Sequence, residues 1–281
     1  NGSSKVYGDA DPALSYTVTT GTLVGSDTLT GTLSRAPGED VGHYAIGQGT
    51  LSAGSNYVLT FNLGNFLIAT RSITITADAK TKVYGDPDPE LTWSITAGTL
   101  ADGDTISGSL VRTAGEDAVM YGYAIGQGTL SAGDNYAITY QGAVLTITKR
   151  TLVIQIDEVS KTYGEADPEL TWSFASGSVL EGDPFTCELG RIPGEQVGAY
   201  FIYAETLVWD HTNYTIMTYH KNLLITPRAI TVTAAAEGKT YGDEDPALDW
   251  TVTTGSLVSG DALSGVLTRA AGENVGSYAI G

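Results

Sequence analysis

Acidic side chains gather directly after a recurring Tyr-Gly pair, and this is the pattern in the chain that could bind a metal ion. The carboxylates concerned are those of Asp86, Asp88, Glu90, Glu165, Asp167 and Glu169. Carboxylate oxygens are the ligands that a hard cation such as Ca²⁺ prefers. Their order is not that of an EF-hand or a glycine-rich calcium repeat, and prolines interrupt it. We therefore expect no metal and no cofactor, with calcium kept as the alternative.

The same segment has a simpler interpretation as a connection between strands, within the string Lys-x-Tyr-Gly-x-x-Asp-Pro. Glycine permits a positive φ, aspartate caps a turn, and proline fixes the chain before the next strand. Backbone geometry alone would explain why the motif recurs. Its central pairs are Tyr7 and Gly8, Tyr84 and Gly85, Tyr163 and Gly164, and Tyr241 and Gly242.

Two further charged patterns recur at the same interval. An arginine precedes a glutamate by four residues, with a glycine between them, which predicts ion pairs that span a turn. These pairs are Arg35 and Glu39, Arg112 and Glu116, Arg191 and Glu195, and Arg269 and Glu273. Lysines also recur, and an internal amide bond between lysine and asparagine is conceivable. The lysines are Lys5, Lys82, Lys161 and Lys239.

Aromatic residues are the candidates for contact with a sugar. Three of the four tryptophans, Trp93, Trp172 and Trp250, share one repeat position, and they alternate in phase with Leu and Val or Ile, which favours a place in the core. Trp209 occurs in one copy alone. It is therefore the candidate for a ligand-binding contact, with local packing as the equal alternative.

Catalytic patterns are missing. The chain has no Gly-x-Ser-x-Gly motif, its histidines occupy unrelated repeat positions, and Cys187 has no recurring partner. Residue type alone does not exclude a glycosidase pair of carboxylates, but no insertion interrupts the repeat to form an active site. We expect no catalytic residues and no enzyme activity.

The elements that carry these residues belong to a tandem array with a period of about 78 residues. Recurring arginines at Arg71, Arg150 and Arg228 each open a new apolar alternation. They divide the chain into residues 1–70, which lack a first strand, 71–149, 150–227, and 228–281, which lack the closing strands.

Alternation with a period of two predicts strands with one buried face, about six in each unit. The expected strands run over residues 14–18, 44–46, 57–61, 66–68, 73–75, 91–95, 123–125, 145–147, 170–174, 223–225, 230–232 and 248–252. A helix, if present, is short and lies near residues 23–29. The fold class is mainly β, with small β-rich domains in tandem.

The passage from one unit to the next contains no flexible linker, so we expect stiff joints and an elongated rod. The incomplete end units have two readings. The chain is a fragment of a longer protein, or the end units are completed by strands from neighbouring copies. We favour the fragment.

Composition and charge exclude several partners. The 281 residues carry 32 acidic and 14 basic side chains, a formal net charge of -18, which repels nucleic acid and anionic membranes. No stretch is apolar enough to insert into a membrane. One cysteine forms no internal disulfide, and the hydrophobic fraction of 42% suits folded domains.

The Tyr-Gly-x pairs, the following Asp-Pro, the Gly-Glu turn and the arginine-led strand together resemble MBG domains of YGX type, found in tandem in large bacterial surface adhesins. The resemblance covers every unit. It implies secretion or cell-surface display, a small domain related to the β-grasp of mucin-binding repeats, and a stalk or adhesive role. Expected partners are host or surface glycans, or neighbouring copies in a filament. The leading interpretation is a structural stalk, and the alternative is a multivalent glycan- or mucin-binding module.

Overall fold

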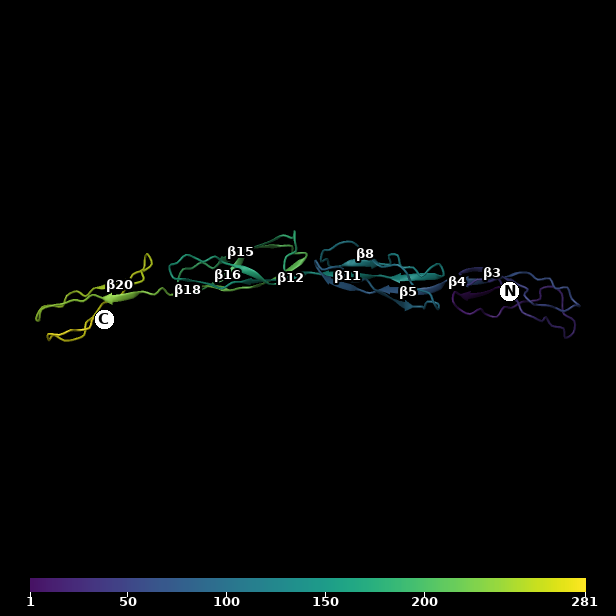
Figure 1. Ribbon diagram of the computed structural model, residues 1–281, viewed down its shortest axis with the longest axis horizontal. Coiled ribbons are helices and arrows are strands. Elements are labelled where there is room, and N and C mark those ends of the chain that lie inside the picture. The colour runs from purple at the N-terminus through teal and green to yellow at the C-terminus, as the bar shows by residue number, and fades with distance from the viewer. The chain divides into compact units, whose positions relative to one another are not determined.

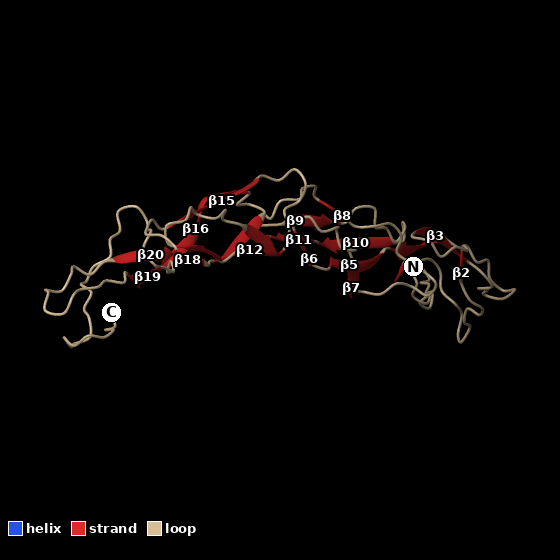
Figure 2. Cartoon of the chain, turned by 60° about the vertical axis from the view of Figure 1, so that its left-hand side comes forward, coloured by secondary structure: helices blue, strands red, loops and turns tan.

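The computed structural model describes residues 1–281 and consists of strands and connecting loops without any helix (Figures 1 and 2). This confirms the mainly β class. The helix expected near residues 23–29 was wrong, because Gly21 and Gly25 have positive φ values of 79° and 57° and interrupt any helical turn. The chain divides into two compact units, Asn1–Lys149 and Arg150–Gly281, and each is described by itself.

The second repeat is complete and contains two sheets. Its strands are β5 (Arg71–Ala77), β6 (Lys80–Val83), β7 (Trp93–Ala97), β8 (Val111–Arg112), β9 (Tyr123–Gly126), β10 (Tyr136–Gln141) and β11 (Ala143–Thr148). One sheet has the order β10-β5-β7 and the other has the order β6-β11-β9-β8. The chain therefore passes from the first sheet to the second three times, between β5 and β6, between β7 and β8 and between β10 and β11.

The strands on either side of the first and the last of these passages pair in the same register. Arg71 lies opposite Tyr136 at the start of the parallel pair β5 and β10, and Lys80 lies opposite Leu145 at the start of the parallel pair β6 and β11. The residue offset is the same in both pairs. The first and last strands of the repeat thus form one parallel ladder that runs through both sheets, with a short interruption in the middle.

Alternating side chains of this ladder form the core of the repeat. Ile73 and Ile75 on β5 are buried with Tyr136, and Leu145 on β11 is buried with Ile125 on β9. Trp93 packs against the first of these clusters, which fits the core position expected for the recurring tryptophan. Thr and Ser fill many of the outward positions, as a strand with one dry face requires.

The third repeat has the same two-sheet plan. Its strands are β12 (Arg150–Ile156), β13 (Val159–Thr162), β14 (Trp172–Ser176), β15 (Phe185–Arg191), β16 (Gly198–Trp209), β17 (Tyr214–Tyr219) and β18 (Asn222–Thr226). The sheet orders are β14-β12-β17 and β13-β18-β16-β15. The repeat differs in the long hairpin of β15 and β16, which extends to Phe185 opposite Trp209.

The first repeat forms only the second of these sheets, with the order β1-β4-β3-β2. Its strands are β1 (Ser3–Val6), β2 (Ser34–Arg35), β3 (Gly42–Gly47) and β4 (Gly64–Ala69). Residues 14–18 and 57–61 were expected to be strands and are not. In the second repeat the matching strands pair only through the central strand β5, and the first repeat has no counterpart of β5 in this sequence.

The fourth repeat contains β19 (Thr231–Ala234) and β20 (Trp250–Thr254), which form a two-stranded antiparallel sheet. Trp250 and the equivalent Tyr16 of the first repeat are 38% and 43% exposed, so the core position predicted for this aromatic holds in the complete repeats only. The chain has no helix that could span a membrane.

Candidate functional site: the joint between repeats

Each Tyr-Gly pair forms a tight turn, which in the first three repeats follows a short strand. In the first repeat the amide of Asp9 donates to the carbonyl of Val6 at 3.0 Å, and Gly8 has a φ of 80°. This is the geometry of a type II turn, whose third residue needs a positive φ. The equivalent glycines have φ values of 82°, 85° and 97° at Gly85, Gly164 and Gly242.

The turn also contacts the following repeat. A Cβ atom at Gly8 would lie 2.7 Å from the Cβ of Ala101, so a side chain there would collide with the second repeat. The ring of Tyr7 meets that of Tyr136 edge to face, with centroids 5.5 Å apart. The Tyr-Gly signature therefore has two physical reasons, the backbone turn and the close approach of a neighbour, and sequence reasoning gave only the first.

Arg71 ties this turn to the second repeat. It is the first residue of β5, and its Nε donates to the carbonyl of Tyr7 at 2.7 Å. Its Nη2 lies 2.5 Å from a carboxylate oxygen of Asp9, and its Nη1 donates to the hydroxyl of Thr99 at 3.3 Å. One guanidinium thus bonds to both repeats in a fixed planar fork.

Asn135 forms a second set of hydrogen bonds between the first and second repeats, in addition to those of Arg71. The side-chain amide of Asn135 donates to a carboxylate oxygen of Asp40 at 2.9 Å, and its oxygen accepts from the amide of Val41 at 2.8 Å. The recurring asparagine is therefore used at this joint to bond the preceding repeat. Together with a single residue, Thr70, between β4 and β5, these bonds make a short and closely packed connection.

The third and fourth repeats meet in the same way. Arg228 donates to the carbonyl of Tyr163 at 3.3 Å and to the hydroxyl of Ser256 at 3.3 Å. Tyr163 donates to a carboxylate oxygen of Asp261 at 3.2 Å. A Cβ atom at Gly164 would lie 2.3 Å from a methyl of Val258. The same kinds of contact therefore recur at the two joints that lie within the compact units.

A closed ring of four alternating charges lies next to each turn. In the second repeat Lys82 Nζ is 2.6 Å from Asp88 Oδ1 and 2.5 Å from Glu116 Oε2. Arg112 completes the ring, with Nε 2.6 Å from Asp88 Oδ2 and Nη2 bonded to Glu116 Oε1. The predicted ion pair across the turn, between Arg112 and Glu116, is therefore one side of a larger cluster that includes the lysine and the aspartate.

All four repeats contain this ring. The other rings are Lys5, Asp11, Arg35 and Glu39; Lys161, Asp167, Arg191 and Glu195; and Lys239, Asp245, Arg269 and Glu273. The lysine is the buried member, with side-chain exposures of 3–5% in the first three repeats, whereas the glutamates are well exposed. A buried ammonium requires such partners, because an unpaired one is costly.

The pKa values of the ring residues show that it is held in its ionised form. Hydrogen bonds from Arg112 first, and then Lys82, lower the pKa of Asp88 to about 2. Burial alone lowers the pKa of Lys82, but its bonds to Asp88 and Glu116 outweigh this and raise it. The lysine ammonium groups lie beside carboxylates instead of asparagine amides. The hypothesis of a lysine to asparagine amide was therefore wrong.

The arginine of the ring also fixes the turn that follows it. Arg112 Nη1 donates to the carbonyls of Thr113 and Gly115 at 2.9 and 2.6 Å, and its guanidinium lies 5.4 Å from the ring centre of Tyr123. Tyr123 in turn donates to the carbonyl of Asp117 at 3.0 Å. A Cβ atom at Gly115 would lie 2.2 Å from that tyrosine ring, so the recurring glycine makes room for it.

The structure does not gather the calcium candidates into one cluster. Asp88 and Asp167 are bonded to the lysine and arginine of their rings, and Glu165 accepts from the amide of Thr162 at 3.0 Å. No group of three or more His, Cys, Asp or Glu side chains has the arrangement of a metal site. Asp86, Glu90 and Glu169 join no such group. Calcium binding remains a prediction for a titration.

Trp209 lies at the far end of β16, half-buried, with its ring 3.9 Å from that of His211. The extra length of this hairpin carries it away from the ladder. The third repeat also has a cluster of three other aromatic rings, Trp172, Phe174 and Phe185, with centroids between 5.2 and 5.6 Å apart. The structure therefore keeps both a packing role and a contact role open to Trp209.

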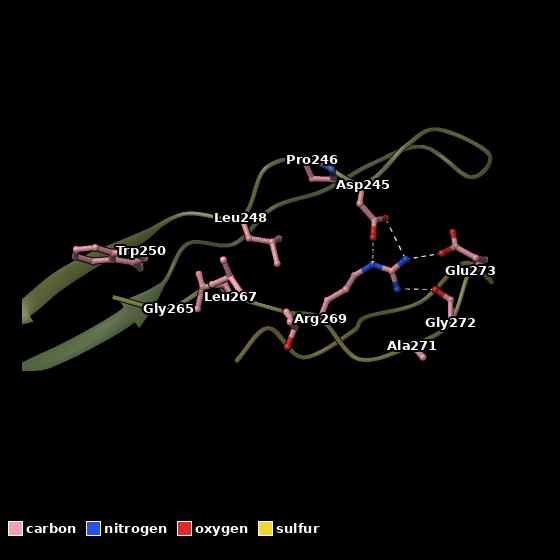
Figure 3. Close-up of a pocket in the computed structure, with 12 residues that line it drawn as sticks. Asp245, Pro246, Leu248, Trp250, Gly265, Leu267, Arg269, Ala271, Gly272 and Glu273 are labelled. Atoms are coloured by element: carbon pink, nitrogen blue, oxygen red, sulfur yellow. Dashed lines mark hydrogen bonds and ion pairs between the residues drawn. The ribbon is translucent and has the colours of Figure 1, made fainter. Parts of the chain in front are cut away.

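A hollow of about 770 Å³ lies in the fourth repeat beside its charged ring (Figure 3). Leu248 and Leu267 line it. Their equivalents in the second repeat, Leu91 and Leu110, pack against the cluster that contains Leu145 of β11. The hollow therefore corresponds to the place that a closing strand fills in the second repeat.

The model for the MBG domain (YGX type) matches the chain four times, over residues 1–67, 73–146, 152–224 and 230–281. The chain belongs to this family, as its Tyr-Gly turns suggested. No curated protein and no solved structure is similar to it at a significant level. MBG repeats of this kind are typical of extracellular surface proteins, and the chain is consistent with the repeat region of one.

Proposed function

We propose that these repeats form a structural stalk in a secreted bacterial cell-surface adhesin or extracellular filament, which holds an adhesive part away from the surface. The observation that carries the proposal is the parallel pairing of the first and last strands of each complete repeat. A chain that enters at one end of a parallel pair leaves at the other, so each added repeat extends the array.

The joints support the same proposal. Arg71 and Asn135 bond the first repeat to the second through one guanidinium and one amide, and no flexible linker intervenes. Short joints with directed hydrogen bonds restrict bending, and this favours a semi-rigid rod over loosely tethered domains. The net charge of -18 opposes self-association and suits display in solvent.

Small-angle scattering on the whole chain, with particle imaging, tests the stalk. We expect a largest dimension close to the sum of the repeat lengths and a single, narrow distribution of shapes. A compact particle, or a wide distribution of bend angles, would contradict the proposal.

The alternative is a multivalent module in which each unit binds a host or surface glycan weakly. The observation in its favour is Trp209, which occurs in the third repeat only and whose ring lies 3.9 Å from that of His211. A glycan array probed with the chain and with Trp209→Ala separates the two proposals. A stalk gives no retention with either protein, whereas a binding module is retained and loses retention with the variant. The proposal includes no catalytic activity, no nucleic-acid partner, no cofactor and no membrane insertion by these residues.

A further inference from the structure

The ladder between the first and last strands of a repeat is placed where tension would act. In the second repeat it begins where the amide of Arg71 donates to the carbonyl of Asn135 at 3.0 Å. It ends where the amide of Tyr84 donates to the carbonyl of Thr148 at 2.8 Å. The chain enters the repeat at Arg71 and leaves it after Thr148, at opposite ends of the ladder.

Pulling on the two ends would therefore slide the two strands past one another. Bonds of a parallel ladder are evenly spaced along the strands. Under sliding they are all loaded together, and several must break in the same event. Force perpendicular to the strands, applied at one end of the ladder, would instead load the bonds one after another. Each bond would then break alone at a lower force.

One face of each ladder segment is also shielded from water, and the second segment is anchored. Ile73 and Ile75 beneath the first segment and Leu145 beneath the second are at most 1% exposed. Shielded hydrogen bonds exchange with water less readily than exposed ones. Lys82, in the second segment, is held by the charged ring, and Thr148 donates from its hydroxyl to the carbonyl of Lys82 at 3.2 Å.

The third repeat has the same arrangement, from the bond between Arg150 and Asn213 at 2.8 Å to that between Tyr163 and Thr226 at 2.9 Å. We infer that each complete repeat is a load-bearing unit, in which the paired terminal strands resist tension in shear and the charged ring fastens the exit end. This role goes beyond a spacer, because a spacer needs length alone. It rests on the proposed stalk only in assuming that tension reaches the repeat through its ends.

Force spectroscopy on the full chain tests the inference through two pulling directions on one repeat. Both proteins carry Cys187→Ser, so that handles attach only at the introduced cysteines, and both carry Ser72→Cys on β5. The second handle is Thr146→Cys on β11, which loads the ladder along its length. In the matched control it is Ala137→Cys, which lies directly opposite Ser72 on β10 and loads the ladder across its width. All three sites are exposed.

We expect the second repeat to open at a force several times higher with the Thr146 handle than with the Ala137 handle. Each opening should release the chain between its handles, up to about 25 nm for the longer one. Equal forces in the two directions, or a higher force for the Ala137 handle, would overturn the inference. Thermal melting of both proteins checks that the introduced cysteines do not change the stability of the fold. A difference in opening force then reports the unfolding barrier in each pulling direction, since forced unfolding depends on the unfolding rate.

The result is separable from that of the stalk proposal. A compact particle in scattering would contradict the stalk and leave the direction dependence of one repeat unchanged. Loss of direction dependence would contradict the load-bearing role and leave an extended particle as it was.

Discussion

Lys161 Nζ lies 2.6 Å from Asp167 Oδ1, although the lysine side chain is only 3% exposed. The lysine belongs to β13 of the parallel ladder, the aspartate follows the Tyr-Gly turn, and Arg191 of the same ring ends β15 of the antiparallel hairpin. The ring therefore joins the ladder, the turn and the hairpin of one repeat. Its members are distant in sequence, so it stabilises the tertiary arrangement and not a local element.

Replacement of the buried lysine by an apolar residue of similar length should destabilise the second repeat. Lys82→Met leaves Asp88 and Glu116 without one cation each, and hydrogen bonds to charged groups are worth about 1.5–3 kcal/mol. Both carboxylates remain partly solvated and paired with Arg112, so we expect the loss to lie near the lower end of that range. Chemical denaturation of the full chain, followed by hydrogen exchange at β6 and β11, measures it.

Lys80→Met is the matched control for this change. Lys80 lies two residues earlier on the same strand and bonds to the hydroxyl of Thr92 at 2.6 Å instead of to the ring. Its replacement should cost clearly less. Equal losses for the two variants would show that the ring contributes nothing specific.

Acid should weaken every complete repeat in a defined pH window. The folded pKa of Asp88 is about 2, and the pKa of Glu116 is also lowered, by Lys82 first and Arg112 second, while the unfolded values lie near 4. A lowered folded pKa means that the stabilisation is complete above the unfolded value and is lost as the pH falls toward the folded one. The melting temperature should therefore be flat from pH 7 to about 5 and fall between about 4 and 2.

The double variant Lys82→Met with Glu116→Gln is the control for the acid effect. It removes two of the four charges of one ring, so the pH dependence of the second repeat should become shallower while the third repeat keeps its own. Hydrogen exchange resolves the two repeats. An unchanged slope in the second repeat would contradict the assignment to the ring.

Much of the fold could be predicted from the sequence, because two signals are local. Alternation with a period of two is visible in any strand with one dry face, and it located β5, β7 and β11 correctly. The ion pair between Arg112 and Glu116 was also predictable, since its members are four residues apart. The failures at residues 14–18 and 57–61 have one cause. Their pairing depends on a central strand that the first repeat does not contain.

The ring and the joint could not be predicted in full because they depend on contacts between distant residues. Lys82 and Glu116 are 34 residues apart, and they meet only once the ladder has formed. Gly8 of the first repeat lies close to Ala101 of the second repeat. A signal for the ring was nevertheless present, since lysine, aspartate, arginine and glutamate recur at fixed spacings in all four copies. Equal spacing did not reveal which of them touch.

Loss of Arg71 should loosen the joint between the first two repeats without unfolding either ladder. Arg71→Gln removes the charge that faces Asp9 and leaves the carbonyl of Tyr7 with a shorter donor or none. We expect faster hydrogen exchange around the Tyr-Gly turn of the first repeat and around Thr99, with rates in the third repeat unchanged. Arg71→Lys should give an intermediate effect, since it keeps the charge and loses the fork. Unchanged hydrogen exchange at the turn would show that the bonds of Arg71 do not stabilise the joint.

Calcium should leave the melting temperature unchanged. Asp88 already bonds Lys82 and Arg112 through its two oxygens, and a cation would have to displace both. Calorimetric melting with and without millimolar Ca²⁺ decides the point, because a ligand that binds the folded state must raise the midpoint. Magnesium at the same concentration controls for ionic strength. A rise specific to calcium would revive the carboxylate clusters as a site.

Gly115→Ala should clearly destabilise the second repeat. Gly115 has a φ of 139°, which an L side chain rarely adopts, and the new Cβ would lie 2.2 Å from the ring of Tyr123. The backbone strain alone costs about 1–2 kcal/mol, and overpacking adds about 1–3 kcal/mol. Gly133→Ala separates the two effects, because Gly133 has a φ of 85° but no atom within 4 Å of its added Cβ. Denaturation should therefore show a clearly larger loss for Gly115→Ala, and equal losses would mean that the tyrosine moves aside without cost.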